Sequence, residues 1–362
     1  MKFRLSVCIA CVLWAATATA GTATLPSGAV LVEPDHWNVP AGRADADAGI
    51  VLQTLARQGA AAAITRLESW SDPARFELAA AKVIETLQAQ PSTAPASTSV
   101  TVEFLSALER APIRLYQRHE ETAADWFLPV FNIPAQAASA LQLLAFAQDR
   151  DALVVRLQSD PRSALDEAKD SGQLLAASIE HVSPSAVDRI ITLALADDIT
   201  LPSPAWAALA RRSPEPAILL ATLQHANALD VLPLIEELPP KLTPTVALDW
   251  LQQAARMPDY ASSAVLGLGT LASRSPAAET ALAKYLGDPL TGASAAAALA
   301  RLARPNRLER IDALLSKAST AAVVTDLALA LRLEGSDAAL QRLQQLSSDP
   351  RLPAAAKAEL QR

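Results

Sequence analysis

The chain is poor in cysteine. Its 362 residues include only Cys8 and Cys11, and both lie in an N-terminal segment that we expect to be removed on export. The exported chain then has no thiol and no disulfide. This excludes thiol redox chemistry, a cysteine nucleophile and a zinc site with cysteine ligands.

Aromatic residues are scarce as well. They make up 4% of the chain, whereas apolar residues of all kinds make up 51%. The apolar share is carried by Ala, Leu, Val and Ile. Because Ala and Leu are strong helix formers and strands are enriched in aromatic and β-branched residues, this mix favours an all-α fold.

Concentrated positive charge is also missing. The formal net charge is −7, and loss of the two positive charges of Lys2 and Arg4 leaves −9. No run of Lys or Arg is longer than two residues. Nucleic-acid binding and docking on anionic lipid both need a basic surface, so the sequence argues against both kinds of partner.

The N-terminal segment 1–20 is typical of a secretory signal peptide. Lys2 and Arg4 precede a 12-residue stretch, Leu5–Ala16, that is apolar except for one serine. Ala18 and Ala20 then place small residues at the two positions that signal peptidase reads. We therefore expect cleavage after Ala20 and a periplasmic or secreted protein.

Two other interpretations of this segment are weaker. An uncleaved membrane anchor needs about 20 apolar residues, which a 12-residue stretch does not reach. A lipoprotein modified at Cys11 would have only six residues between Arg4 and that cysteine, too few for an apolar core. Since no second apolar run of spanning length follows, we expect no transmembrane segment in the mature chain.

A periodic leucine pattern predicts the architecture. Leu271, Leu302 and Leu331 recur at a period of about 30 residues, which lies in the range of helical repeat proteins. A second series with the same period, shifted by half a unit, consists of Leu286, Leu315 and Leu346. Such a period indicates a stack of helical hairpins, in which neighbouring hairpins supply each other's core.

Helix starts are marked by a side chain that accepts hydrogen bonds, placed directly before a proline. The acceptor can cap free amides of the first turn, and proline has no amide to leave unsatisfied. The residues in the acceptor position are Asp72, Asp160, Ser183, Ser203, Ser213, Thr243, Ser275, Asp288 and Asp349. Because no long alternating pattern competes, we predict almost no strand.

The sequence divides into six parts. The predicted break lies in a stretch rich in Pro, Ser and Thr, which suits a surface loop. In order, the parts are the signal peptide 1–20, an irregular lead-in 21–48, an N-terminal helical piece 49–89, the loop 90–100, a helical repeat array 101–349 and a C-terminal capping helix 350–362.

The region 260–346 resembles the short HEAT-like repeats of the phycobilin-lyase type of HEAT protein. The resemblance covers about a quarter of the chain and rests on period and apolar pattern, since the Pro, Asp and Arg positions of a strong HEAT unit are not repeated in register. It implies a right-handed α-α superhelix that serves as a binding scaffold. Tetratricopeptide repeats fit less well, because their Trp, Gly-Tyr and Phe positions are absent.

Motifs for catalysis or cofactor binding are missing. His119 begins a sequence like that of a zinc protease, but Ala123 stands where the second histidine would follow. Adjacent carboxylates on a helix point about 100° apart, so the acidic pairs of this chain suit a solvated surface. We predict no catalytic residue, no metal and no cofactor. Gly267 and Gly269, inside a predicted helix, indicate close helix packing and not a ligand loop.

One segment, 113–134, has clustered aromatic residues among Arg, His and acidic residues. Trp, Tyr and Arg dominate the energetics of many interfaces, so this segment is a candidate binding surface. Its candidate binding residues are Tyr116, Arg118, His119 and Trp126. The alternative is that the aromatic residues fill the core where the N-terminal piece joins the array.

The function that follows is an exported HEAT-like scaffold, without catalysis of its own, that binds a protein, a peptide or a cell-envelope component. The alternative is a periplasmic helical enzyme of hydrolase or lyase type, whose acidic site is assembled only in the fold. A third interpretation, a helical accessory domain like that of lytic transglycosylases, leaves no room for their catalytic domain.

Overall fold

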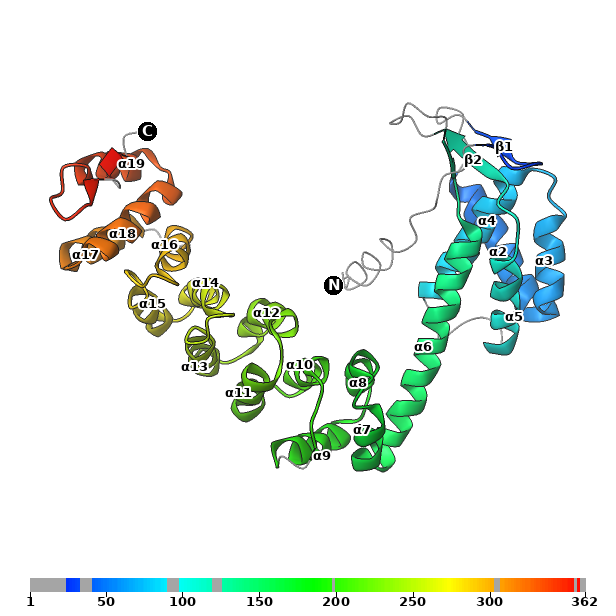
Figure 1. The fold of residues 1–362 in the computed structure, drawn as a ribbon, viewed down its shortest axis with the longest axis horizontal. Coiled ribbons are helices and arrows are strands. Elements are labelled where there is room, and N and C mark those ends of the chain that lie inside the picture. The colour runs from blue at the N-terminus through cyan, green and yellow to red at the C-terminus, as the bar shows by residue number, and fades with distance from the viewer. Residues whose placement is uncertain are drawn as a thin grey trace. The chain divides into compact units, whose positions relative to one another are not determined.

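Figure 1 shows a computed structural model of the chain, which describes residues 24–32, 41–89, 98–118, 126–196, 199–302, 307–354 and 357–358. These residues form eighteen α-helices, one short 3₁₀-helix and one three-stranded sheet. The predicted all-α fold with very little sheet is therefore confirmed. The predicted signal peptide lies outside the described residues.

The chain forms two compact units, residues 1–149 and 150–362. Helix α6 (Ile133–Ser159) contributes its first part to one unit and its last turns to the other. The predicted break at 90–100 lies inside the first unit, between α4 (Pro73–Ala89) and α5 (Thr98–Glu109). Because both of these helices belong to one core, the two units do not divide at this stretch.

Helices α2 (Ala41–Gln58) and α3 (Ala60–Glu68) complete the N-terminal unit, in which α2 packs against α3 and α4. Helix α2 begins well before position 49, where the helical piece was predicted to start. Its first two turns mix alanine with charged residues, and Asp47 is buried there and accepts two hydrogen bonds from Arg75, at 2.7 and 2.6 Å. A buried carboxylate paired with the partly exposed Arg75 thus stands where an amphipathic pattern would have an apolar side chain.

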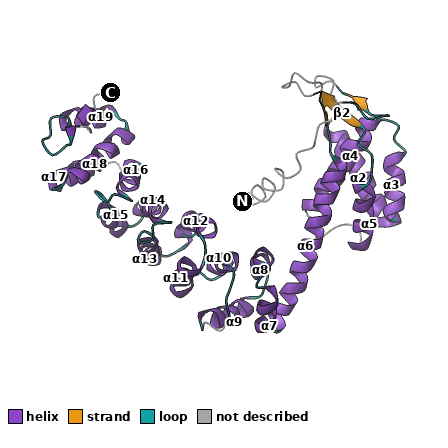
Figure 2. Cartoon of the chain, in the orientation of Figure 1, coloured by secondary structure: helices purple, strands orange, loops and turns teal. Residues whose placement is uncertain are grey.

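The small sheet of this unit has the order β1-β2-β3 and is drawn in orange in Figure 2. Strand β1 (Val30–Leu31) pairs in parallel with β2 (Leu115–Arg118), and β3 (Phe127–Pro129) pairs antiparallel with β2. The predicted irregular lead-in thus contains a strand and the start of a helix. Such short strands cannot show an alternating pattern.

The second unit is a helical solenoid built from two rows of helices (Figure 1). Helix α7 (Pro161–Ala168) precedes the rows and packs against α8 and α9. One row holds the first helix of each hairpin, and we call it the first-helix row. Its members are α8 (Gly172–Ile179), α10 (Ser203–Arg212), α12 (Ala228–Glu237), α14 (Ala261–Ala272), α16 (Gly292–Ala300) and α18 (Ala321–Glu334). The second-helix row holds their partners: α9 (Pro184–Leu195), α11 (Pro216–His225), α13 (Pro244–Ala254), α15 (Pro276–Ala283), α17 (Arg307–Lys317) and α19 (Asp337–Leu346).

The hairpin repeat extends farther toward the N-terminus than the leucine pattern shows, but it starts later than the predicted position 101, because residues up to Asp149 belong to the N-terminal unit. It begins at Gly172, each first helix contacts the next member of its row, and one apolar core runs from Leu153 to Leu352. The steps on either side of α12 are unequal, since the start of α12 lies closer in sequence to the start of α10 than to that of α14. This irregularity, with the 3₁₀-helix η3 (Pro239–Lys241) after α12, explains why the period is lost upstream of Ala261.

Most of the predicted capping residues cap a helix or a turn. The Asp160, Ser183, Thr243 and Ser275 side chains each accept a hydrogen bond from an amide of the first helical turn. The predictions for Ser203 and Ser213 are wrong. Ser203 lies inside α10 and donates to Asp230 at 2.5 Å, and Ser213 ends that helix while α11 starts after Glu215.

Close approach between neighbouring first helices depends on small side chains. Figure 1 places α14 between α12 and α16. A Cβ atom built on Gly269 of α14 would lie 2.6 Å from the Cβ of Ala298 on α16. A Cβ atom on Gly267 would lie 3.1 Å from the end of the Leu251 side chain. The predicted packing role of these two glycines agrees with both distances.

Adding one methyl group at Gly269 should therefore destabilise the array. Overpacking costs about 1–3 kcal/mol, against a gain of about 0.5–1 kcal/mol from better helix propensity, so we expect Gly269→Ala to lower the free energy of unfolding by about 1–2 kcal/mol. Urea denaturation followed by circular dichroism measures this free energy of unfolding. The control is Gly49→Ala in α2, where the added Cβ meets nothing within 4 Å and should be neutral or stabilising. Equal stabilities of Gly269→Ala and the unchanged chain would contradict the packing argument.

Candidate functional site

The predicted binding residues lie at the small sheet of the N-terminal unit. Tyr116 and Arg118 are on β2, and Trp126 directly precedes β3. Antiparallel pairing sets Arg118 opposite Phe127, the residue that follows Trp126. His119 lies outside the described residues. Trp126 is 42% exposed and Tyr116 only 6%. Tyr116 is therefore a packed residue, which fits the core alternative, while binding by Arg118, His119 and Trp126 stays a prediction.

A buried carboxylate that the sequence analysis missed holds the start of β2. Glu77 on α4 has no exposed surface, and its Oε1 accepts hydrogen bonds from the amides of Arg114 and Leu115, at 2.5 and 3.1 Å. The Arg114 guanidinium lies 4.1 Å from the centre of the Phe76 ring. Glu77 lies on the same apolar face of α4 as Ala80. An acidic residue on an otherwise apolar helix face was the feature of the sequence that could have revealed this buried carboxylate.

Burial raises the pKa of Glu77 to about 7, although the two amide donors and the charge of Arg114 act in the opposite direction. Its Oε2 atom has no hydrogen-bond partner among the described residues. The charge of Glu77 in turn adds to the effect of burial in raising the pKa of Tyr116. This carboxyl group fixes the sheet to α4 and is sensitive to pH.

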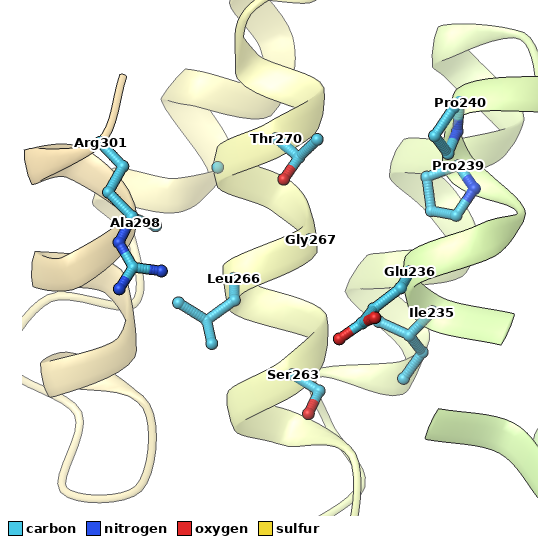
Figure 3. Close-up of a pocket in the computed structure, with 11 residues that line it drawn as sticks. Ile235, Glu236, Pro239, Pro240, Ser263, Leu266, Gly267, Thr270, Ala298 and Arg301 are labelled. Atoms are coloured by element: carbon cyan, nitrogen blue, oxygen red, sulfur yellow. The ribbon is translucent and has the colours of Figure 1, made fainter. Parts of the chain in front are cut away.

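The array carries a partly open depression of about 350 Å³ on its first-helix row. Figure 3 shows that residues of α12, α14 and α16 line it. Glu236 of α12 and Arg301, directly after α16, lie on opposite sides of α14, and Leu266 of α14 lies between them. The residues lining the depression also include Ile235, Pro239, Pro240, Ser263, Gly267, Gly269, Thr270 and Ala298.

The charged and apolar side chains of this depression are available to a ligand. Leu266 is 38% exposed. Glu236 and Arg301 form no side-chain hydrogen bond or ion pair with the described residues. The neighbouring Glu237, by contrast, accepts from Arg211 and Lys241 at 3.0 and 2.8 Å.

Other arginines of the array donate to carbonyls in the connections between helices. Arg212 donates to the carbonyl of Val182 at 2.8 Å, and Arg351 donates to that of Ala318 at 2.8 Å. Arg274 donates to the carbonyl of Leu242 at 3.3 Å. Each of these bonds joins one hairpin to an earlier connection in the array and so supports the stacking of the hairpins. Since Arg301 makes no such bond within the described residues, its guanidinium is not used in that way.

The carboxylates that come closest to an acid–base pair have structural partners. Burial raises the pKa of Asp326 on α18, and the nearby charge of Asp288 adds to this rise, while hydrogen bonds from Thr291 and Leu290 lower the pKa of Asp288. Asp326 accepts from the Gly287 amide at 2.7 Å, and Asp288 accepts from the Thr291 amide at 2.9 Å. These bonds shape the turn before α16.

Two searches for other kinds of site gave negative results over the described part of the chain. No group of three or more His, Cys, Asp or Glu side chains there is placed to hold a metal ion. None of the helices described is both long enough and apolar enough to cross a membrane. Comparisons of the chain with family models, with curated proteins and with solved structures gave no match.

Glu77 makes a prediction about pH. Its pKa is about 7 in the folded chain and near the ordinary 4.5 when unfolded, so the folded state binds more protons between these values. The free energy of unfolding of the N-terminal unit should therefore fall by about 2–3 kcal/mol as pH rises from 4.5 to 7, and then stay level as far as this group is concerned.

Hydrogen exchange of the amides at 114 and 115, measured at about pH 5 and pH 8 and corrected for intrinsic rates, follows this change locally. Glu77→Gln should remove the pH dependence. Glu85→Gln is the matched control, because Glu85 is on the same helix but exposed, with Lys82 at 2.7 Å. The same pH slope in Glu77→Gln and in the unchanged chain would show that another group is responsible.

Proposed function

We propose that this protein is an exported HEAT-like scaffold that binds an extended segment of a partner protein on its first-helix row. The observation that carries the proposal is the depression over α12, α14 and α16, where an exposed leucine lies between two charges of opposite sign that have no partner among the described residues. Stacked hairpins are suited to this task, because successive helices form a continuous surface along the array.

The form of the depression favours a polypeptide over a small molecule. Sites for small molecules are lined predominantly by apolar side chains, whereas this one is partly open and has, on either side of one exposed leucine, a charge with no partner among the described residues. A polypeptide can compensate by contacting several helices at once. Leu229, 84% exposed at the start of α12, supplies further apolar surface on the same row.

The signal-like N-terminus supports the exported location. Lys2, Arg4, the 12-residue apolar stretch and the small residues at Ala18 and Ala20 together favour cleavage after Ala20. A partner would then be met outside the cytoplasm, as a protein or as a peptide of the cell envelope.

Site-specific photo-crosslinking in the producing cell tests the proposal. A photoreactive amino acid at position 266 should give adducts of discrete mass, and the same amino acid at position 249, exposed on α13 in the second-helix row, should not. Leu266→Asp should prevent the isolated partner from binding while lowering the free energy of unfolding by no more than about 1–2 kcal/mol, since the side chain is partly exposed and the change costs mainly helix propensity and partial burial.

The controls separate the parts of the proposal. Equal adducts from positions 266 and 249 would contradict binding on the first-helix row. N-terminal sequencing of the same purified chain should begin at Gly21. A chain that begins at Met1 would contradict export and leave the binding result unaffected.

A further inference from the structure

Resting on the proposed function, we infer that the depression selects a peptide segment with one basic and one acidic side chain on either side of an apolar residue. Glu236 faces the basic side chain, Arg301 the acidic one, and Leu266 the apolar residue between them. The inference starts from the placement of these three residues across α12, α14 and α16 (Figure 3).

The two charges are not neutralised by the described part of the protein. Glu237, next to Glu236 in sequence, has two cationic partners, Arg211 and Lys241, whereas Glu236 has none among the described residues. Arg274 reaches carbonyls of the preceding hairpin, whereas Arg301 does not within the described residues. An unpaired charge in a partly open site attracts an opposite charge on a ligand and repels a like one.

The two sides of the depression, α12 with Glu236 and α16 with Arg301, set the spacing of the ligand charges. Packed helix axes are about 8–10 Å apart, so α12 and α16, on the two sides of α14, are about 16–20 Å apart. The Glu236 and Arg301 side chains extend from these helices and shorten the gap. An extended peptide rises about 3.3 Å per residue and its alternate side chains share one face, so charges four positions apart, with the apolar residue midway, span about 13 Å and fit between the two helices.

Hydroxyl groups on α14 are placed to meet the peptide backbone. Seven threonines in other parts of the chain donate to the carbonyl four residues earlier: Thr54, Thr65, Thr86, Thr192, Thr222, Thr280 and Thr325. Thr270 makes no such bond, and neither Thr270 nor Ser263 has a side-chain partner among the described residues. Both hydroxyls therefore keep a donor and acceptors for amides and carbonyls of a bound chain.

The close packing of α14 is part of the site. Gly269 lets α16 approach α14, and this approach brings Arg301 within reach of a ligand that also contacts Glu236. The charges select the ligand by sign, and the apolar centre and backbone contacts supply the remaining affinity. Exposed charge pairs are weak, so we expect each matched charge to change the dissociation constant by about two- to fivefold.

Blocked heptapeptides with a common apolar centre and different flanking residues test the inference. The varied pair stands two positions before and two positions after the apolar centre, and consists of Lys and Glu in both orders, two Lys, two Glu or two Gln. Fluorescence anisotropy with the full chain measures each dissociation constant. The unchanged protein should prefer a Lys/Glu peptide by about fivefold or more over both like-charged peptides at low salt, with a smaller preference at higher ionic strength.

Charge reversal should change the ranking in a defined way. Glu236→Arg makes both sides of the depression positive and should favour the peptide with two Glu. Arg301→Glu makes both sides negative and should favour the peptide with two Lys. The matched controls Asp249→Arg and Lys317→Glu change net charge by the same amounts at exposed positions of the second-helix row and should keep the original ranking.

The outcomes distinguish this inference from the proposed function. If Leu266→Asp abolishes peptide binding but all charge variants keep one ranking, the depression is the binding site and the charge rule is wrong. If Leu266→Asp leaves the binding of every peptide unchanged, or no peptide binds at about 1 mM, the depression is not a peptide site and both ideas fail.

Discussion

The structure of the array depends on close contact between successive first helices. No hairpin has a core of its own, because each buries its apolar stripe against the next hairpin. Where α14 meets α16, the contact requires a glycine at 269 and an alanine at 298. Arg212, Arg274 and Arg351 add directional bonds from one hairpin to carbonyls in earlier connections between helices.

The candidate site also depends on the close contact between successive first helices. Glu236 and Arg301 belong to different hairpins and face one depression because two helix-to-helix steps separate them in the row. A wider spacing between α14 and α16 would keep both charges and lose the site. The N-terminal unit uses another device, in which the buried carboxylate of Glu77 joins the start of β2 to α4.

The sequence predicted what is local and periodic. The helices, many of their caps, the solenoid and the packing role of Gly269 follow from patterns that repeat within one or two hairpins. The small sheet could not be predicted, because Val30 pairs with Leu115, a partner far along the chain, and the strands are very short. Glu77 and the pair formed by Glu236 and Arg301 were missed for a related reason, since their surroundings depend on the register between distant helices.

The central claim is that each hairpin is stabilised by its immediate neighbours and not by the array as a whole. Circular dichroism of an isolated fragment, residues 258–362, tests this claim most directly. The fragment contains α14 to α19 and keeps every contact among them. The account predicts a helical signal per residue close to that of the same helices in the full chain. A spectrum dominated by coil would contradict it, because the stability would then have to come from contacts beyond the neighbouring hairpins.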